Sequence, residues 1–323
     1  MQKHLNILLF SLLAMALWLA PHHAHADKFA NWLGDVKAEA RAKGISDATI
    51  NAAFSGVTEN PKVVKLDRKQ PEGTKTFEQY LKLVINKTRQ DKAVKLYKRH
   101  QVMLEEVSRT YGVQAEYIVA LWAIESNFGE RMGDFSIIRS LATLAYDGRR
   151  SEFFRGELFN ALQIIDQGHI SASNMVGSWA GAMGQSQFMP SSFLSYAKDG
   201  NGDGKKDIWG SKADVFASIA NYLSSVGWDA SIGWGAPASG ASESEITSYK
   251  DKSPLGSWNQ KGITPASTIY WDAPVALLSG NHHNGGPYYL VSKNYDNILK
   301  WNRSRYFGIA VGTLADHIRK KVK

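Results

Sequence analysis

Cysteine is absent from this chain of 323 residues. Its absence excludes disulfides and also the lipid attachment that bacterial lipoproteins carry on a cysteine. Beyond the N-terminus, no apolar run reaches the length of a membrane span. Lys and Arg form no dense block of the kind that binds nucleic acid, and there is no internal repeat or long low-complexity linker. The remaining composition, 44% hydrophobic and 21% charged, is typical of a soluble globular protein with a substantial core.

The N-terminus has the organisation of a signal peptide. Lys3 provides positive charge, an apolar run extends from Leu5 to Ala20, and Ala24-His25-Ala26 forms a small-x-small cleavage site. The alternative is an uncleaved anchor helix, for which the run is short. We therefore expect cleavage after Ala26, no stable membrane insertion and a periplasmic mature protein that is not a lipoprotein. The sequence leaves open whether the mature protein is released from the cell.

The chain is basic, with a formal net charge of +8. A basic surface suits an anionic polymer or membrane surface. Export argues against nucleic acid as the partner. The alternative is a solvated basic surface without any partner.

Helical periodicity dominates the chain up to about residue 228 and returns at its end. Gly44 is expected to end the first helix, and Val94, Tyr97, Val102 and Leu104 are expected to be buried in the third segment. The expected helical segments are 28–43, 45–54, 77–111, 117–128, 151–165, 213–226 and 306–320.

Between residues 229 and 287 the pattern changes to Gly, Ser, Pro and short β-prone pieces, namely Ser267–Trp271 and Val275–Leu278. We interpret this stretch as a small β-containing insertion in a mainly α (α+β) protein. The expected organisation is a signal peptide at 1–26, N-terminal helices with a catalytic core at 27–228, the insertion at 229–287 and a return to the core at 288–323.

One carboxyl group is expected inside an apolar helix. Glu125 shares a helical face with Ile118, Leu121, Trp122 and Phe128, and Gly129 can end the helix close to it. Burial raises the pKa of a carboxyl group, as a general acid requires. The alternative is a buried glutamate paired with Arg131 or Arg139.

A glycine-rich stretch, residues 178–192 (SWAGAMGQSQFMPSS), is the second unusual feature. Its glycines permit close approach of another chain. Ser178, Gln185 and Gln187 offer uncharged hydrogen-bonding groups, which suit sugar hydroxyl and acetamido groups. The alternative is a tight loop between helices.

Together these stretches resemble the lytic murein transglycosylase B family (glycoside hydrolase family 103). The resemblance extends from about Phe29 to Ile318, so it covers nearly the whole mature chain. The matching segments are 120–129 (ALWAIESNFG), 141–145 (LATLA), 181–191 (GAMGQSQFMPS), 199–204 (DGNGDG), 220–223 (ANYL) and 301–304 (WNRS).

The resemblance implies a lysozyme-like helical catalytic domain with Glu125 as its acid/base. It implies further that Ser178 and Gln187 lie near the muramic acid and that Asn302 belongs to the family's Tyr-Asn-x-Ser motif. Trp301 replaces the tyrosine of that motif, so a tyrosine hydroxyl role does not transfer to it. The complete set of expected substrate contacts is Ser178, Gln185, Gln187, Asn302, Trp301, Tyr306 and Tyr146.

The expected reaction is the non-hydrolytic cleavage of the MurNAc-β-1,4-GlcNAc bond of peptidoglycan, which leaves 1,6-anhydro-MurNAc ends. No Asp or Glu near the glycine-rich stretch obviously supplies the second carboxylate of a glycosidase. We therefore expect Glu125 to act first as acid and then as base, in a monomeric enzyme of the peptidoglycan lyase class. The alternatives are a muramidase that hydrolyses the same bond and a non-catalytic peptidoglycan-binding protein.

An acidic stretch follows the spacing of an EF-hand-like calcium loop. Asp199, Asn201, Asp203 and Asp207 occupy ligand positions, with Gly204 at the sharp turn. Position 12 is Gly210 rather than a glutamate, and Asp214 is the natural substitute. The expected ligand set is Asp199, Asn201, Asp203, Lys205, Asp207 and Asp214.

The role of this Ca²⁺ would be structural. The alternative is an Asx-rich turn without a bound ion or with sodium only. We expect no organic cofactor, and we interpret His282-His283 as an exposed loop pair rather than a metal site.

Overall fold

The computed structural model describes residues 20–69, 75–246, 248–281 and 285–322. Most of the predicted signal peptide and the His282-His283 pair lie outside these ranges. Within them, no helix is both long enough and apolar enough to cross a bilayer. The described residues form two compact units, one within residues 20–69, 133–183 and 189–194, the other within residues 75–132, 184–188 and 195–322.

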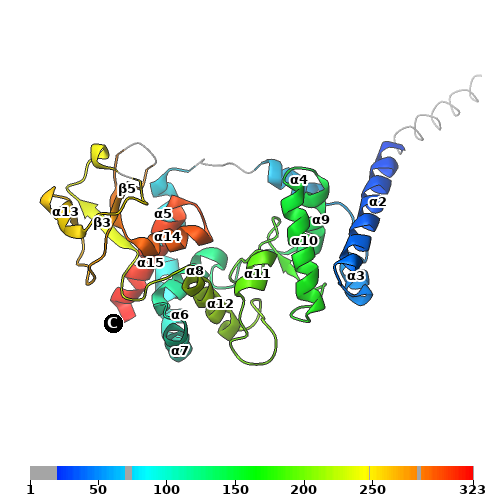
Figure 1. The fold of residues 1–323 in the computed structure, drawn as a ribbon, viewed down its shortest axis with the longest axis horizontal. Helices are drawn as coiled ribbons and strands as arrows, with labels where there is room; N and C mark the ends of the chain where they lie inside the picture. The colour runs from blue at the N-terminus through cyan, green and yellow to red at the C-terminus, as the bar shows by residue number, and fades with distance from the viewer. Residues whose placement is uncertain (1–19, 70–74, 247, 282–284, 323) are drawn as a thin grey trace, which may run out of the picture. The chain divides into compact units, whose positions relative to one another are not determined.

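The first unit is a group of helices with one two-stranded ladder. Helices α9 and α10 lie side by side (Figure 1), and α10 turns Phe154, Leu158 and Leu162 into the core. Arg155 fastens α10 to α2 through Glu39, with Nε 3.0 Å from Oε2. The elements are α2 (Ala20–Ala42), α3 (Asp47–Phe54), α4 (Pro61–Arg68), β1 (Phe135–Ser136), α9 (Ile137–Tyr146), α10 (Ser151–Asp166), β2 (Val176–Gly177) and most of α11 (Pro190–Tyr196).

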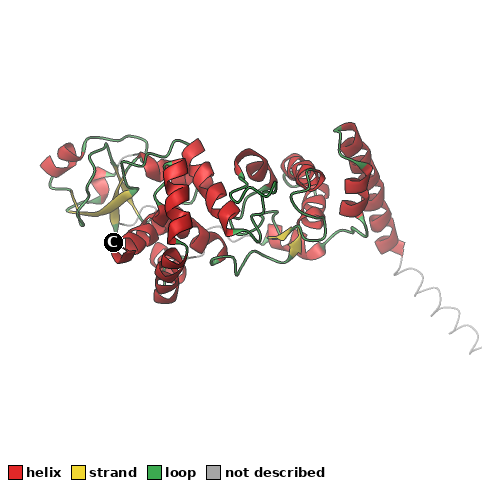
Figure 2. Ribbon diagram, turned by 90° about the horizontal axis from the view of Figure 1, so that it is seen from below, coloured by secondary structure: helices red, strands yellow, loops and turns green. Residues whose placement is uncertain are grey.

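The second unit is built around α8, whose residues are almost all buried. Helices pack against it from several sides, with α15 making the most extensive contact and α6, α12 and α7 following. Figure 2 shows how far helices outweigh strands in this unit. Its helices are α5 (Phe77–Val84), α6 (Lys87–Arg99), α7 (Gln101–Tyr111), α8 (Ala115–Ser126), α12 (Lys212–Ser225), α14 (Lys293–Trp301) and α15 (Arg305–Val322).

A small antiparallel sheet belongs to the second unit. Its strand order is β4-β3-β6-β5, with β3 (Gly235–Ser239), β4 (Thr264–Pro265), β5 (Ala276–Ser279) and β6 (Tyr288–Val291). The segment between β3 and β4 carries the short helices η1 (Glu243–Glu245) and α13 (Leu255–Gln260).

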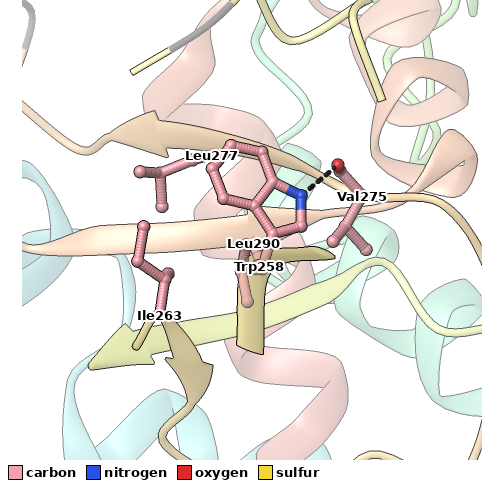
Figure 3. Packing of buried hydrophobic residues seen from close by; sticks show 5 residues of the cluster. All are labelled: Trp258, Ile263, Val275, Leu277 and Leu290. Atoms are coloured by element: carbon pink, nitrogen blue, oxygen red, sulfur yellow. Dashed lines mark hydrogen bonds between the residues drawn. The ribbon is translucent and has the colours of Figure 1, made fainter. Parts of the chain in front are cut away.

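A separate hydrophobic cluster holds this part of the unit together. Trp258 from α13 is 3% exposed and packs with Ile263, Val275, Leu277 and Leu290 (Figure 3). The indole Nε1 of Trp258 donates to the carbonyl of Val275 at 2.9 Å, which pairs its one polar atom. The sheet therefore has a core of its own.

The mainly helical fold with a small β part confirms the predicted class, but two details are wrong. Val102 is 80% exposed, because Leu104 and Val107 face inward on α7 and Val102 lies on the opposite side of that helix. Ser267–Trp271 forms an irregular loop rather than a strand; the strand before it is β4. Strand β6 completes the sheet beyond residue 287, and the functional domain boundaries stay a prediction.

Candidate active site

Glu125 lies in the last turn of α8, where the chain reverses sharply. The helix ends at Ser126, two residues before the end of the predicted segment 117–128. It ends there because Asn127 takes a left-handed conformation with φ 51°. Phe128 (φ 65°) and Gly129 (φ 86°) continue in the same region. Two successive non-glycine residues with positive φ are costly and occur where the surrounding structure enforces them. The reversal leaves Glu125 partly exposed at the end of a buried helix.

Among the residues that the structure describes, the carboxyl group of Glu125 has one hydrogen-bond partner, the indole of Trp301. Nε1 of Trp301 donates to Oε1 of Glu125 at 2.7 Å. Burial raises the pKa of Glu125 to about 7, and the hydrogen bond from Trp301 offsets part of that rise. The carboxyl group is thus close to half protonated at neutral pH, as a group that must both give and take a proton requires.

The alternative of a paired core glutamate is not realised. Among the described residues, neither Arg131 nor any other cation of the same unit forms an ion pair with Glu125. Arg139 is used within the first unit, where its guanidinium donates to Thr58 and to the carbonyl of Glu59.

Aromatic side chains pack around Trp301, the hydrogen-bond partner of Glu125. Trp301 packs edge-on against Tyr222, with ring centroids 4.7 Å apart, and contacts Phe188 at 5.1 Å. The charge of Glu125 contributes to raising the pKa of Tyr80 to about 12, after burial as the larger cause. Tyr80 in turn contacts Tyr306 at 5.8 Å. No sequence motif points to Tyr80, because it lies on α5, and the packing of α5 against α15 brings it here.

Residues 184–188 of the glycine-rich stretch are bonded to the end of α8. Gln185 is 2% exposed; its Oε1 accepts from Nε1 of Trp122 at 2.8 Å, and its Nε2 donates to the carbonyl of Trp209 at 2.6 Å. Ser126 donates to the backbone carbonyl of Gln185 at 2.7 Å. A Cβ at Gly129 would lie 2.6 Å from Oε1 of Gln185, so only glycine fits there. Both ends of the Gln185 amide are therefore engaged in holding the loop to the helix.

Gln187 is arranged differently from Gln185. It is partly exposed, with φ 51°, and its Nε2 donates to the carbonyls of Met132 (3.0 Å) and Gly184 (2.9 Å). Its Oε1 accepts no hydrogen bond from the described residues. Asn302 ends α14, is exposed, and uses Oδ1 to accept from the backbone of Ser304 at 3.0 Å, which leaves its Nδ2 as a donor.

The acidic loop satisfies its carboxylates with its own backbone. The Oδ atoms of Asp199 accept from Gly202 (2.7 Å), Asp203 (3.2 Å) and Gly204 (2.8 Å), and the amide of Gly204 is the largest cause of the lowered pKa of Asp199. Oδ1 of Asp203 accepts from Lys205 at 2.8 Å. These bonds fix the shape of the turn.

Asp214 closes the acidic loop onto α12. It is fully buried and accepts from the backbones of Asp207 (2.6 Å) and Gly200 (3.0 Å). Burial is the main cause of its raised pKa. The oxygen-rich donor set suits a hard cation such as Ca²⁺. However, no group of three or more His, Cys, Asp or Glu side chains converges as metal ligands in the described part of the chain.

Comparison with known proteins places these features in one family. The family model described as Transglycosylase SLT domain matches residues 28–316. This chain belongs to the transglycosylase SLT family. The predicted recognition is confirmed, and with it the lysozyme-like helical fold class.

Several known proteins of this kind are similar to this chain over most of its length. SltB3 from Pseudomonas aeruginosa, solved with NAG-anhNAM-pentapeptide, is 41% identical with a TM-score of 0.84, covering 90% of this chain and 79% of SltB3. SLT35 from Escherichia coli, solved with calcium, is 27% identical with a TM-score of 0.75, covering 92% and 94%. Membrane-bound lytic murein transglycosylase B from E. coli strain K12 is 31% identical over 240 residues, which are 74% of this chain and 66% of that protein, slightly less than two thirds.

Two residues that the family resemblance assigned to substrate lie in the other compact unit. Oγ of Ser178 accepts from the backbone of Ala182 at 2.9 Å, which closes the first half of the glycine-rich stretch. Tyr146 packs edge-on against Phe29 (5.1 Å) and Trp32 (5.5 Å) on α2. The second unit brings together Glu125, Trp301, Gln185 and Gln187. The substrate contacts of all these residues stay predictions.

Proposed function

We propose that this family member is a lytic transglycosylase that cleaves the MurNAc-β-1,4-GlcNAc bond of peptidoglycan and leaves 1,6-anhydro-MurNAc ends. The observation that carries the proposal is a lone, partly exposed carboxyl group with a pKa of about 7. No second carboxylate among the described residues contributes to that pKa, whereas hydrolytic glycosidases use a pair. The anhydro-muramoyl ligand bound by SltB3 supports the same product.

In the proposed reaction, Glu125 first gives one proton and then takes another. The protonated carboxyl group donates to the glycosidic oxygen as the C1–O bond breaks, and the substrate's acetamido oxygen stabilises the cationic C1. The resulting carboxylate then removes the proton of the C6 hydroxyl, whose oxygen bonds to C1 and closes the anhydro ring. Glu125 ends protonated, so atoms and charge balance without water.

Trp301 has a defined part in this scheme, which follows from its hydrogen bond. An indole N–H can donate and cannot accept, so Oε1 of Glu125 must be the acceptor in the 2.7 Å bond. The acidic proton therefore sits on Oε2. We assign Trp301 the role of a positioning residue that selects the oxygen from which the proton leaves. The substrate contact predicted for Trp301 stays a prediction beside this role.

The products distinguish this reaction from hydrolysis. Purified sacculi are digested with the enzyme and the soluble fragments are weighed by mass spectrometry. A transglycosylase gives fragments that are lighter by one water than those from a muramidase, and their ends resist borohydride reduction. Fragments with ordinary reducing ends would establish a muramidase, and the absence of fragments would favour a binding protein.

We propose that Gln187, Asn302, Tyr306, Ser178 and Tyr146 contact the glycan strand. The free Oε1 of Gln187 and Nδ2 of Asn302 support this for two of them, since each can bond a sugar acetamido or hydroxyl group. Gln185 is better suited to supporting the loop, because both ends of its amide are already bonded.

We further propose that the acidic loop binds one Ca²⁺ in a structural role, as the calcium complex of SLT35 suggests. The ligands would be oxygen atoms of Asp199, Asn201, Asp203, Lys205, Asp207 and Asp214, and no reaction step passes through the ion. Titration calorimetry on chelator-treated protein is the test: binding heat that disappears in Asp203→Ala supports the site, and no heat for the unaltered protein would refute it.

Finally, we propose that the mature protein acts in the periplasm, on the composition of residues 1–26. N-terminal sequencing of protein recovered from the periplasmic fraction is expected to begin at Asp27. A protein that begins at residue 1 in that fraction would contradict the proposed cleavage.

A further inference from the structure

A cavity of about 590 Å³ lies in the same compact unit as Glu125. It is bordered by the start of α8, the C-terminal half of α15 and the loop that joins β4 to β5. Glu116, on its wall, precedes Glu125 by nine residues on α8, so the two side chains start about 13 Å apart along the helix axis. No residue of the proposed catalytic machinery lines this cavity.

Two adjacent aromatic residues, Tyr270 and Trp271, line the cavity from the loop between β4 and β5. Trp271 packs against the hydrophobic cluster of Figure 3, which fixes the position of its ring. A Cβ at Gly233 would lie 2.8 Å from Nε1 of Trp271, so the wall opposite the indole has room only for glycine. Tyr270 is 92% exposed although it is a large aromatic residue. The cavity thus has one fixed and one freely accessible aromatic ring.

The charged groups on the opposite wall balance one another. Asp316 accepts from Nε1 of Trp234 at 2.9 Å and pairs with Arg319, which lies 3.9 Å from Glu116. With Lys320, the lining contains two acidic and two basic side chains. Because the lining carries no net charge, it does not favour a polyanion or an anionic membrane as the ligand.

Fixed donors and acceptors beside aromatic rings fit one class of ligand well. A neutral sugar ring presents C–H groups on its face, which pack on an aromatic ring, and hydroxyl or acetamido groups at its edge, which bond to carboxylates and guanidinium groups. We propose that this cavity binds an N-acetylhexosamine segment of a glycan strand, at a distance from the scissile bond. The identity of the strand as peptidoglycan rests on the proposed function.

Such a site would hold a polymeric substrate after the site around Glu125 releases it. A strand bound at two places rebinds the second as an intramolecular event, which raises the overall affinity for long strands over short ones. This contact would be of little use to a small ligand that cannot span both places.

The test measures binding to purified, insoluble sacculi in the Glu125→Gln background, in which the strands remain intact. Adding Tyr270→Ala is expected to weaken sacculus binding about three- to tenfold, the range for losing one aromatic contact. Tyr270→Phe, which keeps the ring, should restore the affinity. The matched control is Phe153→Ala, which removes a 49% exposed aromatic residue on α10 and should leave binding as in the Glu125→Gln parent.

The outcomes separate the two proposals. Equal binding by the Glu125→Gln parent and the Tyr270→Ala variant would overturn the second site, as would equal losses from Tyr270→Ala and Phe153→Ala. Because Tyr270 is almost fully exposed, unfolding does not confuse the result, and circular dichroism verifies this. The proposed function fails separately, if the wild-type enzyme releases no anhydro products from the same sacculi.

Discussion

The carboxyl groups of Glu125 and Asp316 both accept a hydrogen bond from a tryptophan, but they differ in whether a cation pairs with them. Each accepts a hydrogen bond from an indole N–H, Glu125 from Trp301 at 2.7 Å and Asp316 from Trp234 at 2.9 Å. Burial is the largest cause of the raised pKa in both. Asp316, however, also has Arg319 as an ion-pair partner, whereas no cation among the described residues of the same unit pairs with Glu125. A tryptophan donor positions a carboxyl group without forcing it to ionise, whereas an added guanidinium makes it a structural ion pair.

Removing the carboxyl group of Glu125 should have the largest effect. Glu125→Gln keeps the shape and the bond from Trp301 but abolishes proton transfer, so release of anhydro fragments should fall at least about a thousandfold. Retained cleavage of sacculi would identify another residue as the acid.

The same variant should be more stable than the wild type at alkaline pH. The folded pKa of about 7 lies above the ordinary value, so ionising Glu125 costs the folded state stability as the pH rises from about 4.5 to 7. Glu125→Gln avoids this cost and should gain about 1–3 kcal/mol in unfolding free energy at pH 8. At pH 4 urea titrations of the two proteins should coincide; a gain that persists there would have another origin.

Placing a cation beside Glu125, as Arg319 lies beside Asp316, should favour the ionised form of Glu125 and make it a poorer acid. Tyr80→Arg places a guanidinium within electrostatic reach and lowers the pKa of Glu125, so less of the acid form remains at neutral pH. Each unit of lowering costs about tenfold in rate at pH 7, and the falling limb of the pH–rate profile moves to lower pH. Tyr80→Phe is the control, and its limb should stay near that of the wild type.

Removing the indole donor should shift the pH profile in the opposite direction. The N–H of Trp301 favours the ionised form, so Trp301→Phe raises the pKa of Glu125 further and moves the falling limb to higher pH. The rate should drop about two- to tenfold because either oxygen can then carry the proton. An unchanged limb would show that Trp301 only fills space.

The smallest effect is expected for the ion pair itself. Arg319→Ala leaves the carboxylate of Asp316 without its cation and should cost about 1–2 kcal/mol of unfolding free energy at pH 7. The pKa of Asp316 rises further, so part of the loss should be recovered as the pH falls toward 4. Equal urea midpoints for the variant and the wild type at pH 7 would contradict a stabilising role for Arg319.

Local patterns predicted the parts of the site that are continuous in sequence. An apolar helix with one internal glutamate and a glycine-rich loop after it are both visible in the chain, and the helix is α8. Trp301 and Tyr80 approach Glu125 from 176 and 45 residues away, and no periodicity encodes such contacts. Gln185 and Gln187 have the same side chain two positions apart. Only the packing of Trp122 and Trp209 makes the first an internal support and leaves the second an acceptor.

The hydrogen bonds of Gln185 restrict how far loop residues 184–188 can move from α8. The side-chain amide of Gln185 joins Trp122 of α8 to the backbone of Trp209, and the backbone carbonyl of Gln185 accepts from Ser126 at the end of the same helix. Loop residues 184–188 therefore cannot leave α8 without unpairing several buried polar groups at once. Backbone amides there should exchange with solvent as a single cooperative group with the last turn of α8. A strand bound as proposed would then enter and leave across a surface that keeps its shape, without this loop opening.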